Sequence, residues 1–385
     1  MIDLQMFKQS NIVHFCFGLS YLMSGMLLTF VQAILYFGLR PFNKRLYRKI
    51  NYYLAYSFYS QLVFMSEWWS GSTLTLYIKK DEYEKYYGKE HGYLIMNHSY
   101  EIDWLMGWHF CDGVKVLGNC KAYAKKSISY LPPIGWMWKF SEFVFLERSF
   151  EKDKEIIKHQ ISELGDYPDP VWLLLTPEGT RFTKTKHEAS LKFAKERNLP
   201  LLKHHLTPRT RGFTTSLQCC REKMPAIYNI QLAFANDMRT PPTLTSLLYG
   251  KPVHGHLYIQ RIATKDVPED EAAAAKWMQD LFVLKDKMQD SFINTGDFFV
   301  ESGVERVEPF NVKPRIYSLI NTLGWAVVTL TPMFYYFVGL LLTGKLLYFS
   351  IACAIFAGLY ILLQKSISMS KIDQGSSYGA DKKKE

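Results

Sequence analysis

The chain has 385 residues, of which 48% are hydrophobic, and a formal net charge of +10. This is enough for one sizeable globular domain with further elements, and the basic surplus suits an anionic membrane surface, nucleic acid or phosphate-bearing substrates. The six cysteines form no C-x-x-C pair and have no regular spacing, which argues against a disulfide framework or a zinc site and favours reduced thiols on a cytosolic face.

The first element along the chain is an apolar segment without charge. No Asp, Glu, Lys or Arg occurs between Lys8 and Arg40, and the core of the segment, residues 17–39, is long enough to span a bilayer. A cleaved signal peptide would have a shorter apolar region, followed by a cleavage site with small residues. Basic residues follow instead, so we expect residues 1–49 to form an uncleaved membrane anchor with its basic flank in the cytosol.

Two later regions also suggest contact with a bilayer. Residues 50–66 are rich in Tyr and Phe but only moderately apolar, which favours an interfacial helix over a span. Residues 316–344 and 346–364 carry no charge and are separated by Lys345. Together they predict a transmembrane helical hairpin over residues 311–365, with both flanks in the cytosol.

Between the two membrane regions, residues 67–310 read as a globular block. Short apolar runs alternate there with longer amphipathic stretches, which is typical of an α/β domain with a mixed, largely parallel sheet flanked by helices. Two helices are expected over residues 152–164 and 269–292. The expected strands cover residues 93–96, 114–117, 143–146, 171–175, 226–230 and 257–259.

Polar residues follow three of these strands at the point where each strand ends. Asn97-His98, and then Asp103, follow the first strand, Glu147-Arg148 follow another, and the run from Pro177 to Arg181 follows a third. In an open α/β sheet, ligands bind beyond the carboxyl ends of the strands, so we expect these residues to meet at one rim. Polar residues also follow strands that simply reach the surface, and for Arg148 alone this explanation serves equally well.

His98 and Asp103 form a possible acid–base pair. They are five residues apart, roughly 140° around a straight helix, so they can meet only if His98 lies in a strand-to-helix turn and Asp103 in the next turn. The carboxylate would then fix the tautomer of the ring and leave the other nitrogen as a general base. The chain has no G-x-S-x-G elbow, so the expected nucleophile is a substrate hydroxyl. Cys111 or Cys120 as an acyl carrier is the alternative, although neither thiol is marked as activated.

The other rim residues suit an anionic acceptor. Arg148 and Arg181 can bind a phosphate through two hydrogen bonds each, and Gly179 would let the backbone approach closely. Glu178 would orient an arginine or accept a hydrogen bond from a substrate hydroxyl. The sequence contains no H-E-x-x-H, P-loop or G-x-G-x-x-G motif.

These motifs resemble the glycerolipid acyltransferase family. Asn97-His98-x4-Asp103 is followed, 80 residues after His98, by the Pro-Glu-Gly-Thr-Arg run that ends at Arg181. Phe145-x-x-Arg148, residues 131–136 and residues 180–213 match as well. The chain is most similar to the animal 1-acylglycerol-3-phosphate acyltransferases (lysophosphatidic acid acyltransferases) of the gamma/delta-like branch, over nearly its whole length.

The resemblance implies the glycerolipid acyltransferase fold and assigns roles to residues. His98 would be the general base and Asp103 its partner, and the proline of the family's fourth motif falls on Pro200 or Pro208. The acyl group of acyl-CoA would pass to the sn-2 hydroxyl of lysophosphatidic acid, giving phosphatidic acid without an acyl-enzyme, a metal or a cofactor. The implied partners are acyl-CoA, a lysophospholipid acceptor and the bilayer, and not nucleic acid. The residues expected to bind the glycerol phosphate are Arg148, Glu178, Gly179, Thr180 and Arg181.

Three positions depart from the family's usual pattern, and they bear on which head group fits. Glu142 stands where Gly is frequent, Thr176 stands where Phe is frequent, and Phe182 stands where Ser is frequent. Another acyltransferase of the same fold, which uses lysophosphatidylinositol or a lysocardiolipin as acceptor, is therefore an alternative. From other classes, a lipid or acyl-CoA hydrolase and a non-catalytic membrane-shaping protein remain as alternatives.

The basic tail and the topology together predict the location of the protein. Residues 366–385 are rich in Ser, Gly and Lys and are expected to be disordered. The terminal Lys382-Lys383-Lys384-Glu385 resembles a dilysine retrieval signal, which fits a tail in the cytosol. The expected location is therefore the endoplasmic reticulum membrane, with several spans and a cytosolic catalytic domain.

Overall fold

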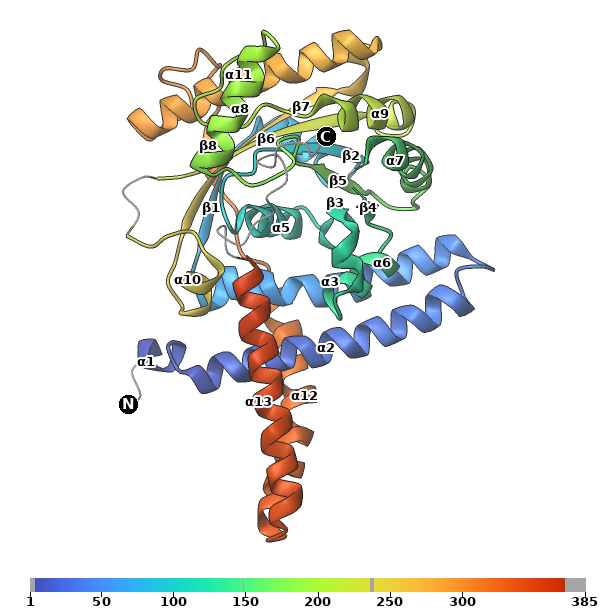
Figure 1. Ribbon diagram of the computed structural model, residues 1–385, viewed down its shortest axis with the longest axis vertical. Helices are drawn as coiled ribbons and strands as arrows, with labels where there is room; N and C mark the ends of the chain where they lie inside the picture. Colours follow the sequence, from blue (N-terminus) through green and yellow to red (C-terminus); the bar gives the residue numbers. More distant parts are fainter. Residues whose placement is uncertain (1–3, 148, 236–238, 371–385) are drawn as a thin grey trace.

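An eight-stranded mixed sheet lies at the centre of the domain and is flanked by helices, as Figure 1 shows. The computed structural model describes residues 4–147, 149–235 and 239–370. The strands are β1 (Thr73–Tyr77), β2 (Gly92–Met96), β3 (Cys120–Lys125), β4 (Val144–Leu146), β5 (Trp172–Leu175), β6 (Ala226–Phe234), β7 (His254–Ala263) and β8 (Pro309–Asn311). The helices within this domain are α4 (Lys80–Tyr86), α5 (Asp103–Gly113), α6 (Ile134–Phe140), α7 (Phe150–Leu164), α8 (Lys184–Glu196), α9 (Thr210–Cys220), α10 (Leu244–Leu248) and α11 (Glu271–Thr295).

The strand order is β4-β3-β5-β2-β6-β7-β1-β8, and most neighbouring strands are parallel. Only the β6/β7 and β1/β8 pairs are antiparallel among the described residues. The prediction of a mixed, largely parallel sheet is therefore confirmed. β2 lies between β5 and β6, so its carboxyl end opens at the middle of the sheet, where open α/β folds place their ligands.

Both faces of the sheet are buried, which explains the continuous apolar run in β2. Leu94 and Met96 point into a core shared with α5 and with the helix α3 (Lys44–Phe64), whereas Tyr93 and Ile95 point into a second core shared with α7, α9 and α11. A strand covered on both faces has no polar alternation, because successive side chains enter opposite layers. The rim residues that follow β2 are therefore carried on a rigid support.

One expected strand is absent. Residues 114–117 were expected in the sheet, but α5 continues to Gly113 and ends in a Schellman turn with Lys115 at φ 65°. The N–H of Val116 donates to Cys111 O at 2.9 Å and that of Lys115 to Asp112 O at 3.0 Å. The apolar residues of this run fill the core from a helix terminus and a 3₁₀ turn, and the strand begins only at Cys120.

The remaining helices lie below the domain in the view of Figure 1. They are α1 (Leu4–Lys8), α2 (Asn11–Gly38), α3 (Lys44–Phe64), which continues into a π-helical turn (Met65–Trp69), α12 (Ile316–Leu342) and α13 (Leu346–Ser370). α12 and α13 form a helical hairpin in the region where a transmembrane hairpin is predicted, and α13 extends five residues past the expected end. The last part of the expected tail, residues 371–385, lies outside the described residues.

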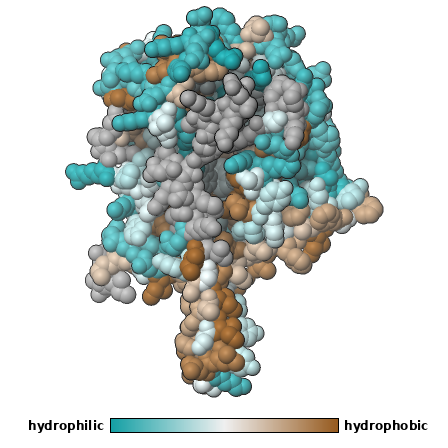
Figure 2. Space-filling model, in the orientation of Figure 1, coloured by the Kyte–Doolittle hydropathy of each residue, from teal (hydrophilic) through white to brown (hydrophobic). Residues whose placement is uncertain are grey.

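The two ends of the chain thus carry long apolar helices, as expected. Among the described residues, α2 and α12 are long and apolar enough to cross a membrane. Figure 1 shows α2 lying across the hairpin. Buried polar residues of α2 pack against α3. Ser24 lies 3.2 Å from Gln61, and Gln32 donates to Asn51 at 2.6 Å. Figure 2 shows hydrophobic residues over the hairpin and the underside of the domain.

Glu142 ties the basic turn between α2 and α3 to the domain. It has a left-handed backbone with φ 59°, a conformation that glycine adopts more readily than other residues. Its carboxylate accepts from Arg48 Nε at 2.8 Å, from Arg40 Nη2 at 3.0 Å and from the Tyr167 hydroxyl at 2.5 Å. Burial would raise the pKa of Glu142, but the Arg48 charge and these hydrogen bonds lower it overall. Glu142 therefore links the turn between α2 and α3 to the domain.

Candidate active site

The structure brings His98 and Asp103 together just beyond the end of β2. His98 lies in the turn after the strand, and Asp103 is the first residue of α5. Nδ1 of the imidazole lies 2.6 Å from Asp103 Oδ2. The other carboxylate oxygen accepts the N–H of Trp104 at 2.7 Å. Because Asp103 is 1% exposed and His98 is 21% exposed in its side chain, the carboxylate is held inside while the ring reaches the surface.

The charge on Asp103 sets the basicity of the ring. Burial would lower the pKa of His98, but the Asp103 carboxylate, through its charge and its hydrogen bond, raises the pKa above its usual value. Glu178 adds to this increase, and Arg181 opposes it. Since the carboxylate occupies Nδ1, the tautomer that it favours carries its proton there and leaves the lone pair of Nε2 for a substrate. The arrangement is that of a base and its orienting group.

Both carboxylate oxygens of Glu178 accept hydrogen bonds from backbone N–H groups. Glu178 follows β5 and is 2% exposed. Its Oε1 accepts the N–H of His98 at 2.7 Å, and its Oε2 accepts the N–H of Leu206 at 3.0 Å. The N–H of Phe182 also donates to His98 O at 2.9 Å, so the turn after β5 holds the His98 peptide from both sides. Sequence reasoning gave Glu178 an arginine or a substrate hydroxyl as partner, whereas the structure pairs it with these two amides.

The other residues of this turn, Gly179 and Thr180, lie close to basic side chains. Gly179 has φ 70°, and a Cβ at this position would lie 3.1 Å from the side chain of Arg209. Arg209 also donates its N–H to Pro177 O at 2.8 Å. Thr180 accepts from Lys186 Nζ at 2.8 Å. Sequence reasoning did not assign Arg209 or Lys186 a role, although Arg209 lies within the stretch that carried the family resemblance.

The structure tests the predicted position of Arg181 but not that of Arg148. Arg181 lies close enough to His98 to lower the pKa of the ring, and it also lines the mouth of a cavity. Arg148 lies outside the described residues, so its expected place at the rim stays a prediction. Of the cationic groups expected from the sequence, the structure therefore places Arg181 at the site and adds Arg209 and Lys186.

An apolar cavity of about 270 Å³ begins beside the dyad. Met96, Trp104 and Arg181 line it near the rim, and Trp172 lines it at the far end, where β5 begins. α2, α3 and α6 complete its walls. The residues that they contribute are Tyr21, Phe58, Leu62, Ile134 and Trp138. The cavity therefore reaches from the rim near His98 toward α2 and α3, and it has the apolar lining that a hydrocarbon chain requires.

The two cysteines considered as acyl carriers lie at the deep part of this cavity. Cys111 and Cys120 are both buried. Burial raises the pKa of the Cys111 thiol well above its usual value, which opposes formation of the nucleophilic thiolate. Among the residues that the structure describes, no group of three or more His, Cys, Asp and Glu side chains could hold a metal ion.

Two family models match the chain. The model described as "Acyltransferase" matches residues 78–198, which contain the dyad and the turn after β5. The model described as "Acyltransferase C-terminus" matches residues 246–325, which contain β7 and α11.

Curated relatives match over almost the full length. The human 1-acyl-sn-glycerol-3-phosphate acyltransferase gamma is 38% identical over 380 residues, 98% of this chain and 98% of the relative. The delta enzyme of Rattus norvegicus is 38% identical over 372 residues, 97% of this chain and 96% of the relative. The chain therefore belongs to the acyltransferase family, in the branch that contains the gamma and delta 1-acyl-sn-glycerol-3-phosphate acyltransferases.

Proposed function

We propose that the protein transfers the acyl group of acyl-CoA to the sn-2 hydroxyl of 1-acylglycerol-3-phosphate, giving phosphatidic acid. The observation that carries this proposal is the His98–Asp103 pair, which lies beside Met96, Trp104 and Arg181, three residues that line an apolar cavity. The names of the gamma and delta relatives support this choice of acceptor.

The dyad supplies the acid–base chemistry. Nε2 of His98 takes the proton of the acceptor hydroxyl as the hydroxyl oxygen bonds to the thioester carbonyl carbon. When the carbon–sulfur bond breaks, the thiolate of CoA leaves and takes the proton from Nε2. Asp103 stabilises the imidazolium that exists between these steps. A positioned base contributes about 10²–10⁴-fold to the rate, and alignment of the two substrates contributes further.

In this proposal, the phosphate group of the acceptor binds to the basic side chains at the rim. Arg181 and Arg209 flank the turn that holds His98, and Lys186 donates to Thr180 of the same turn. Guanidinium groups bind phosphate through paired hydrogen bonds. Arg148 is included among these phosphate-binding residues because it belongs to the Phe145-x-x-Arg148 motif. In this proposal Gly179 and Thr180 shape the phosphate site, while Glu178 acts through the backbone.

The cavity is assigned to an acyl chain, and Gly107 tests this assignment. Gly107 lines the cavity from α5, and a Cβ at this position would meet nothing within 4 Å. We expect Gly107→Phe to exclude about two methylenes of the chain. At about 0.8 kcal/mol per methylene, the loss is about 1.6 kcal/mol, or about 15-fold in kcat/KM for long-chain acyl-CoA.

The measurement is kcat/KM against acyl-CoA of increasing length for Gly107→Ala, Gly107→Leu and Gly107→Phe. Short-chain donors serve as the control in each variant, because they should keep their rates. An equal loss for short and long donors would assign the cavity to something other than the acyl chain.

We also propose that the hairpin of α12 and α13 crosses the endoplasmic reticulum membrane and leaves residues 67–310 in the cytosol. The exposed apolar side of α2, with Phe30, Ile34 and Phe37, provides the N-terminal anchor within residues 1–49. The N-terminal part of α3 brings the basic turn to the same surface, where it suits anionic lipid. This placement delivers lipid substrates to the cavity walls that α2 and α3 form.

The function is tested with the purified full-length protein and a panel of lysophospholipids. We expect lysophosphatidic acid to be acylated faster than lysophosphatidylinositol or lysocardiolipin, and His98→Ala to abolish transfer. Equal rates with lysophosphatidylinositol would overturn the acceptor assignment. Release of fatty acid from acyl-CoA at the same rate without any acceptor would make the protein a hydrolase, and full activity of His98→Ala would remove the dyad from the mechanism.

A further inference from the structure

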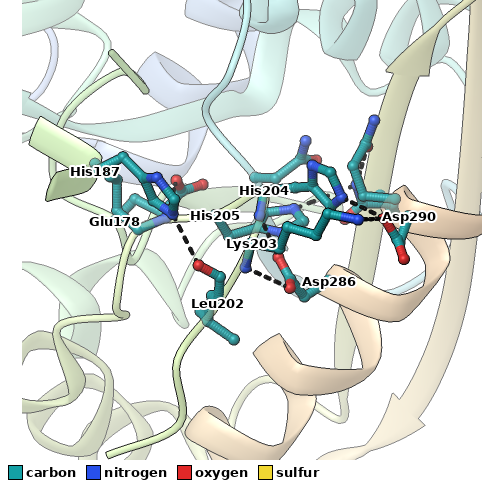
Figure 3. A network of polar contacts seen from close by, with 12 residues as sticks. Glu178, His187, Leu202, Lys203, His204, His205, Asp286 and Asp290 are labelled. Carbon is teal, nitrogen blue, oxygen red and sulfur yellow. Dashed lines mark hydrogen bonds and ion pairs between the residues drawn. The ribbon is translucent and has the colours of Figure 1, made fainter. Parts of the chain in front are cut away.

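One carboxylate of α11 holds the loop that connects α8 to α9. This loop, residues 197–209, needs hydrogen-bond acceptors for its backbone N–H groups that a helix or sheet would otherwise provide. The N–H of Lys203 donates to Asp286 Oδ2 at 2.7 Å, and the N–H of His204 donates to Asp286 Oδ1 at 2.7 Å. Figure 3 shows Asp286 projecting from α11 toward these residues. The loop is therefore fastened to α11 through its backbone.

His205 adds a third hydrogen bond to the same carboxylate. Its ring is buried, and Nδ1 lies 2.9 Å from Asp286 Oδ1. The amide nitrogen of Gln231 in β6, which can only donate, lies 3.4 Å from Nε2 of the ring, so Nδ1 carries the proton and donates it to Asp286. Burial would raise the pKa of Asp286, but the hydrogen bonds from His205 and from the two amides lower it overall. A charged Asp286 thus holds three consecutive residues.

The next residue of the loop connects this anchor to the turn after β2. The N–H of Leu206 donates to Glu178 Oε2 at 3.0 Å, and Glu178 Oε1 accepts the N–H of His98 at 2.7 Å. A continuous series of hydrogen bonds and backbone therefore joins Asp286 to the His98 peptide. If residues 203–206 moved, the buried Glu178 would follow Leu206 or lose one of its two donors, and an unpaired polar group in the interior is costly.

The two members of the dyad are held from opposite faces of the sheet. Asp103 belongs to α5, whose apolar residues pack in one core, whereas α11 packs in the core on the other face. The 2.6 Å contact between His98 Nδ1 and Asp103 Oδ2 requires both supports to stay in register. A displaced His98 backbone would lengthen this contact and misdirect Nε2. Misplacement of a catalytic group by about 1 Å costs up to about 10²-fold in rate.

We propose that Asp286 is a positioning residue of the active site, which anchors residues 203–206 so that Glu178 keeps the His98 backbone in place beside Asp103. Asp286 touches neither substrate and acts through the loop. α11 lies in the region that the C-terminal family model matches, and the proposal gives this region a part in catalysis. The inference rests on the proposed function and deepens it.

Asp290 offers a matched control one turn further along α11. It contacts the same two loop residues, but only through their side chains, since it lies 2.6 Å from Lys203 Nζ and 2.7 Å from His204 Nε2. Its side chain is 36% exposed, against 13% for Asp286. Asp290→Asn therefore removes the same charge from the same helix and leaves the backbone hydrogen bonds of the loop intact.

The test compares Asp286→Asn with Asp290→Asn in the full-length protein. The amide of Asp286→Asn presents an NH₂ group to one of the N–H donors, so at least one backbone hydrogen bond is lost. We expect kcat to fall about tenfold with little change in KM for either substrate. We expect Asp290→Asn to retain the wild-type kcat.

The pH profile separates positioning from a merely structural role. Asp103 raises the pKa of His98, so a looser contact between them lowers this pKa. The acid limb of kcat in Asp286→Asn should therefore move to lower pH and stay at its wild-type position in Asp290→Asn. A variant that only contains less folded protein loses rate by the same factor at every pH and keeps the position of the limb.

Three results would overturn the inference. They are an unchanged kcat in Asp286→Asn, an equal loss of kcat in Asp290→Asn, and a loss of kcat in Asp286→Asn without movement of the acid limb. If Asp286→Asn does not fold, Asp286→Glu takes its place. This variant keeps the charge and both oxygens but is one methylene longer, so it should displace the loop and show both changes to a smaller extent. An unchanged kcat in Asp286→Glu would then refute the inference.

These measurements remain distinct from the test of function. They use whichever acceptor the wild-type protein acylates fastest, so a different acceptor would overturn the acceptor assignment and leave the role of Asp286 intact. If the wild-type protein releases fatty acid without an acceptor, the same variants are compared in that reaction.

Discussion

Replacement of Asp103 by asparagine is expected to lower kcat by about 10³–10⁴-fold with little change in KM. The amide is nearly isosteric but can present an N–H to Nδ1, which would favour the wrong tautomer and place a proton on Nε2. The imidazolium formed during transfer would also lose its opposite charge. Both effects fall on the transition state, so the loss should appear in kcat.

The pH dependence of Asp103→Asn gives a second, independent readout. Asp103 raises the pKa of His98, so the wild-type rate should fall on the acid side at a pH above the usual histidine value. Removal of the carboxylate lowers this pKa, and the acid limb of the residual activity should therefore move to lower pH. Asp280→Asn on the exposed side of α11 is the control. Residual activity above about one tenth of wild type would contradict the assigned role.

Glu142→Gln is expected to destabilise the protein by about 3–5 kcal/mol, because it leaves the Arg48 guanidinium buried with a weakened partner. Arg48 is 2% exposed, and its remaining carboxylate, Glu163, lies at 3.5 Å. Thermal unfolding in detergent should show a melting temperature lower by about 2–4 °C for each kcal/mol in a domain of this size. The activity of the folded fraction at low temperature should persist, since Glu142 lies away from the dyad.

Glu163→Gln is the matched control for this prediction. Glu163 is one third exposed in its side chain and pairs with the partly exposed Lys44, so its loss should cost less than about 1 kcal/mol. The pKa of Glu142 is lowered in the folded state, so its contribution exists above the ordinary glutamate pKa and is lost as the pH falls toward the folded value. The gap between wild type and Glu142→Gln should therefore narrow in acid. An unchanged gap at low pH would assign the effect to packing.

Local sequence patterns were enough to predict the strands next to His98 and Asp103. β2 and β5 are short apolar runs ended by polar residues, and the five-residue spacing of His98 and Asp103 allowed one geometry, which the structure shows. The prediction of a strand at residues 114–117 was wrong for a physical reason. Alternating apolar residues fit either a pleated strand or the end of a helix that folds back into the core, and only the Schellman turn at Lys115 separates the two.

Sequence alone determined the α/β class, the order of the main elements, the apolar helices at both ends and the short-range meeting of His98 with Asp103. These depend on hydrophobic period and on residues a few positions apart, where chain geometry leaves few choices. Tertiary structure alone decided that Glu178 accepts hydrogen bonds from two backbone amides, and that α2 and α3 line the cavity. Such contacts can join residues more than one hundred positions apart, and their energies depend on burial. Neither the contacts nor their energies are defined until the chain has folded.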